Sequence, residues 1–390
     1  MIAFGACSNH KTETSDQYLQ TVISNLKEIK SATYDSQRES WAPGDTVPSV
    51  VSHQYYKAYD NSSDTTLGAS WVILDSQDTT QLAFAYDGTM RALVDEDKKT
   101  IVIDSFTVRK LPFRPVSVPF YQYTQDFIEY VLNTNDSTSL NYEDMGDTVY
   151  IKLTIHEDRQ VEFFGKAYYI PENPDGYHDP TSVYELWIDK TTDLPYKQRR
   201  EMTHNISIET VSNAQFNTMN IEEFVAASYF PADYEIRQYG EKRNVAGPHG
   251  LLGKDAPAWK LTNEYGEEIG LNEFESKVVL VQFTSVNCGP CRASVPFLNK
   301  LSSTHNKEEL NVVAIESFIS NTKVLSTYRK RTGLDYQFLM SEEKVNSQYN
   351  IQATPIFFIL DEGHVIREVF RGYGGASTEE KIIEAINNLL

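Results

Sequence analysis

A long apolar run that leads directly into two closely spaced cysteines constrains the fold more than any other feature of this sequence. The run KVVLVQFTS, at 277–285, is apolar and β-branched almost throughout, which is typical of a strand buried on both faces of a sheet. The motif Cys288-Gly-Pro-Cys291 follows after two further residues, and the next stretch, RASVPFLNKLSSTH, has apolar residues at helical spacing. The pattern predicts a buried strand, a short turn and a helix, with the cysteines at the junction.

The spacing of the two cysteines suits thiol–disulfide chemistry. At the start of a helix, free backbone N–H groups and the positive end of the helix dipole stabilise a thiolate, so we expect Cys288 to be the attacking sulfur. Cys291 lies at i+3 on the same helix face, where Cα atoms fall within the roughly 4.4–6.8 Å that a disulfide requires. It can therefore resolve a mixed disulfide formed by Cys288. Gly289 lets a substrate backbone come close, and Pro290 stiffens the turn.

Other uses of a cysteine pair fit this chain less well. A structural zinc site would need a second pair of Cys or His ligands, and the chain has three cysteines in all. A copper site would need a further ligand such as a histidine, for which His364 in a predicted turn is poorly placed. A structural disulfide across so short a loop removes little entropy from the unfolded chain. We therefore predict a redox-active disulfide between Cys288 and Cys291, with no metal and no flavin or nicotinamide cofactor, against the alternative of incidental thiols.

The order of elements in the C-terminal third is legible from the sequence. A short hairpin around Gly266 precedes the buried run, and a second buried strand, LNVVAIES, follows the cysteine-containing helix. The next helix ends at Gly333, two strands are joined by Asp-Glu-Gly, and a last helix is expected to be capped by Ser377 with Glu380 at the third position. The early strand–helix–strand crossover predicts a central sheet with helices on both faces.

The stretch KDAPAWKLTNEYGEEIGLNEFESKVVLVQFTSVNCGPCRASVPFL resembles the TlpA/ResA-like branch of the thioredoxin superfamily, and the resemblance extends over residues 253–390. It implies a thioredoxin-like α/β domain with a central mixed sheet. In this superfamily a cis-proline faces the cysteine pair, and Thr354-Pro355 matches it, so the Thr354 backbone is expected to pair with an extended substrate. The resemblance implies a thiol-disulfide oxidoreductase in which Cys288 attacks a substrate disulfide and Cys291 releases the product.

Three positions near the pair depart from the family pattern. The tryptophan that usually precedes the first cysteine is Asn287 here, the buried acid of thioredoxins corresponds to Gln282, and an acid of ResA-type relatives falls on Ser294. The sequence therefore shows no side-chain carboxylate in place to relay a proton to Cys291. A Cys-Gly-Pro-Cys core still favours reduction of substrates over their oxidation. Thioredoxin, a reductant, has a reduction potential of about −270 mV.

The region before this domain has mainly β periodicity. Residues 16–34 have apolar residues at helical spacing, and then the period changes to two, with hairpin signals such as Asp87-Gly88. The stretch ELWIDKTTDLPYKQRRE resembles the LolA/LolB-like carriers, which implies an α+β domain at 16–238: an antiparallel β half-barrel with helices. A lipid or other hydrophobic ligand could lie on its inner face, or the domain could dock a partner. A packed β core with no ligand fits the alternating aromatic residues equally well.

The ends of this β region are marked by changes in composition. Residues 239–252 are rich in glycine and charge, which is typical of a linker.

Residues 1–15, at the other end, place Gly-Ala before Cys7 and a polar stretch after it. This pattern resembles the end of a bacterial lipoprotein signal, although its basic segment is missing. The resemblance implies a lipid attached to Cys7 and a location in the cell envelope, on the periplasmic side, where thiols can be oxidised. The alternative is a disordered tail with a chance cysteine.

The charge of the chain excludes some partners. The formal net charge is −20, so phosphate backbones would repel the protein and we expect no nucleic-acid partner.

No apolar run in the sequence reaches the roughly 18–20 residues that span a bilayer. We therefore predict a membrane-anchored, extracytoplasmic reductase of protein disulfides that draws on an external electron donor. The alternative is a lipid- or protein-binding lipoprotein whose thioredoxin-like domain serves mainly for docking.

Overall fold

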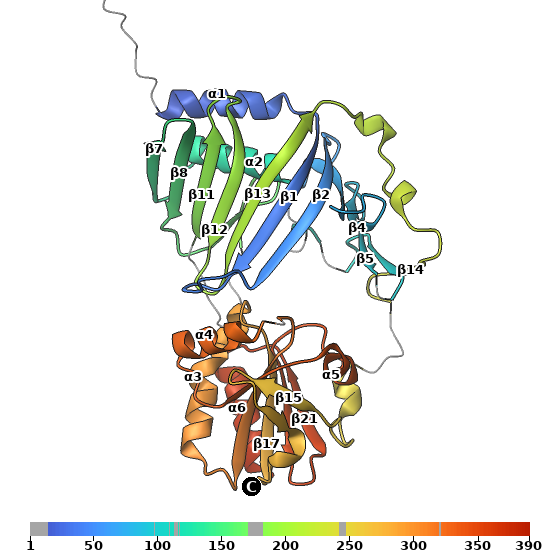
Figure 1. Cartoon of the computed structure of the whole chain (residues 1–390), viewed down its shortest axis with the longest axis vertical. Helices are drawn as coiled ribbons and strands as arrows, with labels where there is room; N and C mark the ends of the chain where they lie inside the picture. The colour runs from blue at the N-terminus through green and yellow to red at the C-terminus, as the bar shows by residue number, and fades with distance from the viewer. Residues whose placement is uncertain are drawn as a thin grey trace, which may run out of the picture.

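The computed structural model shows two bodies in the chain, each built on its own large β-sheet (Figure 1). It describes residues 15–96, 98–108, 110–112, 116, 118–170, 182–241, 247–319 and 321–390. The prediction of a lipid on Cys7 lies outside the described residues. Among the helices that are described, none combines the length and apolar character needed to cross a membrane.

In its described residues, the first body contains a twelve-stranded sheet, a separate two-stranded hairpin and two α-helices. Its strands are β1 (Ser31–Trp41), β2 (Val50–Asp60), β3 (Ala69–Asp75), β4 (Leu82–Tyr86), β5 (Arg91–Asp95), β6 (Thr100–Asp104), β7 (Thr138–Asp144), β8 (Thr148–Ile155), β9 (Val161–Phe163), β10 (Ala167–Tyr169), β11 (Ser182–Asp189), β12 (Leu194–Glu201), β13 (Ile206–Phe216) and β14 (Glu235–Gln238). Its helices are α1 (Ser15–Lys27), α2 (Phe120–Asn133) and the 3-10 turns η1 (Ile221–Glu223) and η2 (Ala226–Tyr229).

The order of strands in the large sheet is β14-β6-β5-β4-β3-β2-β1-β13-β12-β11-β8-β7. Neighbouring strands are antiparallel, as predicted, except that β14 pairs with β6 in parallel. Helix α1 lies across one end of the sheet and α2 runs behind it (Figure 1). Leu19 of α1 and Phe127 of α2 are buried in one apolar core together with Trp71 of β3. A large N-terminal β domain with helices packed against its sheet is therefore present.

Two details of the first body differ from the sequence prediction. The helix expected at 16–34 ends at Lys27, because the side chain of Asn217 accepts hydrogen bonds from the backbone N–H groups of Lys30 (2.6 Å) and Ser31 (3.2 Å) and starts a strand there. That strand, β1, and its neighbour β2 were not predicted. Both carry polar and charged side chains. The place of β1 in the middle of the sheet depends on pairing with β13, far along the chain, and β2 pairs with β1 and β3.

The second body is a seven-stranded mixed sheet in the order β16-β15-β19-β18-β17-β20-β21. Its strands are β15 (Lys260–Asn263), β16 (Glu268–Gly270), β17 (Val278–Thr284), β18 (Leu310–Glu316), β19 (Gln337–Met340), β20 (Ile356–Asp361) and β21 (Ile366–Arg371). Its helices are α3 (Gly289–Thr304), α4 (Thr322–Thr332), α5 (Glu343–Gln348), α6 (Ala376–Asn387) and the 3-10 turns η3 (Pro248–Leu251) and η4 (Leu271–Glu273).

The central strand β17 is buried on both faces, as its sequence predicts. Every residue from 278 to 284 is buried, because β17 is parallel to β18 on one side and antiparallel to β20 on the other. On one face Leu280 packs in a core shared with helices α3, α4 and α6, and on the other Phe283 packs against Tyr349, which follows α5. The predicted mixed sheet with helices on both faces is confirmed for this body.

The ends of two helices test the predicted capping residues. Gly333 ends α4 in the left-handed conformation with φ of +67°, as predicted. The predicted cap of the last helix is wrong, because α6 already begins at Ala376 after Gly375, and Ser377 lies inside it. In this turn the hydroxyl of Thr378 accepts a hydrogen bond from the backbone N–H of Gly374 instead.

Candidate redox site

The two cysteines lie where strand β17 gives way to helix α3, and they are joined by a disulfide bond. Their Cα atoms are 5.2 Å apart. Cys288 is the N-cap residue of α3, and its Sγ accepts a hydrogen bond of 3.2 Å from the backbone N–H of Cys291. Cys288 is partly exposed, whereas Cys291 is fully buried. This arrangement leaves one sulfur open to attack from outside and shields the other.

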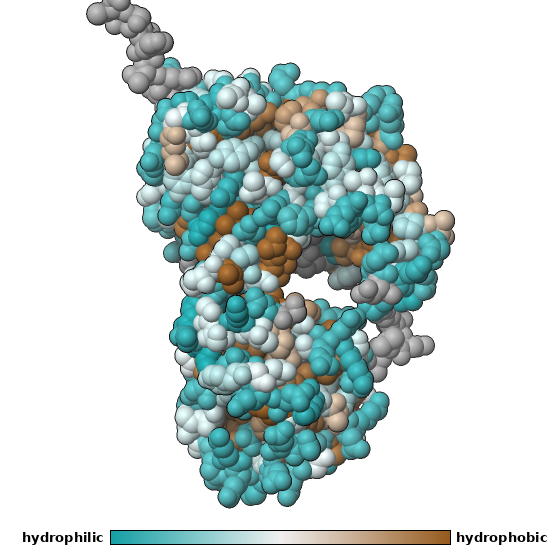
Figure 2. Space-filling view, in the orientation of Figure 1, coloured by the Kyte–Doolittle hydropathy of each residue, from teal (hydrophilic) through white to brown (hydrophobic). Residues whose placement is uncertain are grey.

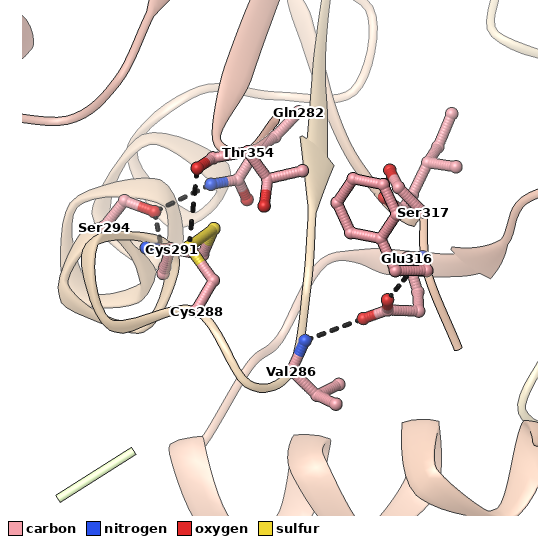
Figure 3. Close-up of a disulfide and its surroundings, with 10 residues drawn as sticks. Gln282, Val286, Cys288, Cys291, Ser294, Glu316, Ser317 and Thr354 are labelled. Atoms are coloured by element: carbon pink, nitrogen blue, oxygen red, sulfur yellow. Dashed lines mark hydrogen bonds between the residues drawn. A yellow bond between two sulfur atoms is a disulfide. The ribbon is translucent and has the colours of Figure 1, made fainter. Parts of the chain in front are cut away.

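The Thr354–Pro355 segment faces this pair. The Thr354–Pro355 peptide bond is cis, and the carbonyl oxygen of Thr354 is 3.7 Å from Cys288 Sγ. Figure 3 shows this oxygen above the disulfide at the start of α3. Gly289 and Pro290 form the first turn of the helix. The structure thus brings the predicted residues of the C-terminal domain together in one place.

A neutral polar pair lies beneath the buried cysteine. Gln282 Nε2 donates a hydrogen bond of 2.8 Å to Ser294 Oγ, and Ser294 Oγ donates one of 2.7 Å to the carbonyl oxygen of Cys291. Both side chains are almost completely buried. The two positions where relatives carry an acid are therefore linked to each other here by a hydrogen bond between neutral side chains.

Sequence reasoning missed one acid near the site, Glu316, at the end of β18. Its carboxylate accepts hydrogen bonds from the backbone N–H groups of Val286 (2.7 Å), Phe318 (2.9 Å) and Ile319 (3.2 Å). Figure 3 shows the carboxylate pointing to Val286, in the loop that leads from β17 to Cys288. Burial raises the pKa of Glu316 to about 7, although these N–H groups and the Ser285 side chain lower it.

The signal that could have revealed Glu316 was weak. It is the single acid that ends the buried run LNVVAIE, and the end of a strand is where an acid is ordinarily exposed to water. In the structure its exposure is 0%. Because the carboxylate holds the loop before Cys288 on one side and the loop after β18 on the other, it fixes the position from which α3 begins.

Two of the cavities that the described residues of the first body enclose are large enough to consider as ligand sites. One, of about 320 Å³, is lined by apolar residues such as Val118 and Phe164 and by the charged pairs Arg38–Glu209 and Arg200–Glu162. The other, of about 370 Å³, lies between the two helices and the sheet and is lined by apolar, polar and charged side chains, among them Leu26, Ala58, Ala69, Tyr121 and Gln125. Within the described residues, no cluster of three or more metal-ligating side chains is found.

These features define the class of the second body. A mixed sheet flanked by helices, a Cys-x-x-Cys disulfide at the start of a helix and a cis-proline segment against it are the features of a thioredoxin-like redox domain.

Comparison with known proteins identifies the family of this chain. The Redoxin family matches residues 251–386. The thioredoxin-like protein YneN of Bacillus subtilis is 30% identical over 122 residues, which are 31% of this chain and 71% of that protein. The thiol-disulfide oxidoreductase ResA of Geobacillus kaustophilus is 25% identical over 150 residues, 38% of this chain and 82% of that protein. The chain belongs to the thioredoxin-like family and is a thiol-disulfide oxidoreductase of the ResA type.

A solved structure can be added to these relatives. The thiol:disulfide interchange protein DsbE from Chlorobium tepidum is 20% identical, with 35% of this chain and 96% of that chain covered and a TM-score of 0.33.

Proposed function

We propose that the protein reduces disulfide bonds in other proteins through Cys288 and Cys291. The observation that supports this most is the position of Cys288, which is partly exposed, caps α3 and accepts a hydrogen bond from the Cys291 N–H. The same N–H group would stabilise a thiolate in the reduced enzyme. The carbonyl of Thr354, 3.7 Å away, lies at the edge where an extended substrate segment would pair with the enzyme.

The proposed reaction has two exchange steps. The Cys288 thiolate attacks one sulfur of the substrate disulfide, a new bond forms between Cys288 and that sulfur, and the other substrate sulfur leaves as a thiolate that takes up a proton. The thiol of Cys291 then loses its proton and attacks Cys288, which forms the enzyme disulfide and releases the second substrate thiol. Two electrons pass to the substrate, so an external dithiol must reduce the enzyme again.

Reduction of insulin disulfides by the full-length protein, with dithiothreitol as electron donor, tests this proposal. Cys288→Ser should lower the rate to that of dithiothreitol alone, because the attacking sulfur is gone. The variant Cys7→Ser is the matched control and should keep the wild-type rate in this soluble assay. An unchanged rate in Cys288→Ser would show that Cys288 does not reduce the insulin disulfides. The alternative of a docking protein would then remain.

For the location, we propose that the protein is held in the cell envelope, on the periplasmic side, by a lipid on Cys7. Support comes from the small residues before Cys7 and the polar stretch after it. The proposed reaction also needs substrate disulfides, which form and persist in compartments outside the cytoplasm. Expression in bacteria with a radiolabelled fatty acid tests it. Wild-type protein should carry the label and sediment with membranes, whereas Cys7→Ser should do neither.

A second candidate function concerns the N-terminal domain, which we propose to be a LolA-like half-barrel that binds a hydrophobic ligand. The cavity of about 370 Å³ between its helices and its sheet favours this role. A fluorescent long-chain fatty acid serves as the probe. Wild-type protein should bind it, and Ala58→Phe, which places a ring in the cavity, should weaken binding at least about tenfold if the site is there. Equal binding by both would remove this candidate.

A further inference from the structure

The loop between β1 and β2, residues 42–49 of the first body, contacts the redox domain at the residue just before Cys288. Asn287 Nδ2 donates a hydrogen bond of 2.8 Å to Ser49 Oγ. Ser49 is itself held in place by its hairpin, since its backbone N–H and its hydroxyl both donate to the carbonyl oxygen of Ser40, at 2.7 Å and 2.8 Å. The hydroxyl thus accepts from one domain and donates within the other.

A second contact joins the same loop to helix α4. Arg331 Nη1 donates a hydrogen bond of 2.7 Å to the carbonyl oxygen of Pro43 and lies 3.4 Å from Asp45 Oδ1. The side chains are largely covered, with 15% of Arg331 and 4% of Asp45 exposed. Burial raises the pKa of Asp45, and the guanidinium of Arg331 opposes that rise. Removing either partner would leave the other charge largely covered and without compensation, which is costly.

The contact covers only part of the hairpin end. Val47 and Val50 remain 45% and 43% exposed. Figure 2 shows hydrophobic surface at the lower end of the upper body, beside the smaller body. Polar contacts at Ser49 and at Arg331 join this loop to the redox domain, so we expect single substitutions at these positions to loosen it.

The position of the loop restricts how a substrate can approach. Asn287 and Cys288 are neighbours in the chain, so the loop bonded to Asn287 lies close to the exposed sulfur, and it continues on both sides into strands β1 and β2 of the N-terminal body. A disulfide on a folded protein can reach Cys288 only if the surrounding surface of that protein also fits beside the β1–β2 loop. Gln352 and Ala353, just before Thr354, are exposed, so a disulfide in a short or unfolded segment can reach Cys288 from that side.

We propose that the β1–β2 loop is a specificity element of the redox site, which favours disulfides in short or unfolded segments over disulfides on folded proteins. The proposal rests on the proposed function, since it concerns which disulfides the same cysteine pair reduces. Asp45, Ser49 and Arg331 act as positioning residues, because they hold the loop against the site and do not touch the reacting sulfurs.

The test compares two substrates with variants on opposite sides of the contact. The substrates are insulin and a hexapeptide cyclised by one disulfide, and the variants are Arg331→Ala and Asp45→Ala in the full chain. Each variant should raise kcat/KM for insulin at least about threefold while kcat/KM for the peptide changes less than about twofold. The double variant should add little to Arg331→Ala alone, because Arg331→Ala already removes the contacts with both Pro43 and Asp45.

Two controls separate docking from folding. Arg367→Ala removes an arginine of the same domain that pairs with Asp361 in its own hairpin, and it should leave both rates unchanged. Hydrogen exchange of residues 42–49 should quicken in Arg331→Ala and in Asp45→Ala but not in Arg367→Ala. If a variant unfolds, Ser49→Ala gives the same test from the other contact.

The outcomes are distinct. Faster exchange in the loop with an unchanged ratio of insulin to peptide rates would overturn the specificity role, and so would a fall in the insulin rate, which would make the loop a binding surface for folded substrates. If wild-type protein reduces neither substrate, the proposed function itself fails, and that result is separate from any change between variants.

Discussion

Glu316 accepts a hydrogen bond of 2.7 Å from the backbone N–H of Val286, two residues before Cys288. A fully buried carboxylate thus holds the loop from which the redox helix begins. Its charge state affects stability, because burial raises its pKa to about 7 in the folded protein.

The first prediction concerns this acid and pH. The folded protein keeps the proton on Glu316 up to about pH 7, whereas the unfolded chain releases it near its ordinary pKa of 4.5. The contribution of this proton to stability is therefore complete below pH 4.5 and is lost as pH rises through 7, by at most about 1.4 kcal/mol per pH unit. Glu316→Gln should remove this part of the slope. Urea unfolding of the C-terminal domain, followed at pH values from 5 to 8, measures it.

Glu362→Gln, at an exposed turn, is the matched control and should keep the wild-type slope. The glutamine in Glu316→Gln places an amide N–H against backbone N–H donors, so we also expect a lower stability that does not depend on pH. A slope equal to that of wild type in Glu316→Gln would show that this carboxylate does not titrate in the range.

The second prediction concerns the neutral pair beneath Cys291. Gln282→Met leaves the buried hydroxyl of Ser294 without its donor, and Ser294→Ala leaves the Gln282 amide without an acceptor. Each change should lower the free energy of unfolding by about 1–3 kcal/mol. The double variant should cost less than the sum, because both polar groups are then gone. Urea unfolding of the four proteins measures the coupling, and strict additivity would mean that the two side chains do not depend on each other.

The C-terminal fold could be predicted from the sequence because its signals are local. The apolar run of β17 and the glycine that ends α4 each depend on residues close together in the chain. The redox motif, Cys288 to Cys291, is likewise a local pattern of neighbouring residues. Position along the chain was enough to place these elements and the strand–helix–strand crossover from β17 to β18, whereas the pairing of β17 with β20 was not predicted.

The features that were missed depend on residues far apart in the chain. Strand β1 is polar enough to resemble a loop, and its Arg38 forms an ion pair with Glu209, 171 residues away. The contact of Asn287 with Ser49 spans 238 residues. The burial of Glu316 depends on loops packed around a strand end. No local pattern records such pairings, since each becomes visible only when the sheets have formed.

The third prediction concerns trapping. In a Cys7→Ser background, Cys291→Ser removes the sulfur that resolves the mixed disulfide, so Cys288 should remain bonded to its substrate. Incubation with insulin should give a covalent adduct that is stable on a non-reducing gel and is released by dithiothreitol. The matched variant Cys288→Ser should give at least about tenfold less adduct, because the remaining Cys291 is fully buried. Equal adducts from both variants would contradict the assigned roles.

The last prediction concerns the reactivity of the reduced pair. In the structure the Cys291 N–H already donates to Cys288 Sγ at the start of α3, and in the dithiol this donor and the helix dipole favour the thiolate. The rate of alkylation of Cys288 by iodoacetamide should therefore reach half of its maximum below about pH 8.5, the ordinary value for a free cysteine. Mass spectrometry should find the first label on Cys288 and little on Cys291. Alkylation that follows the pH profile of a free cysteine would remove the physical basis for Cys288 as the nucleophile.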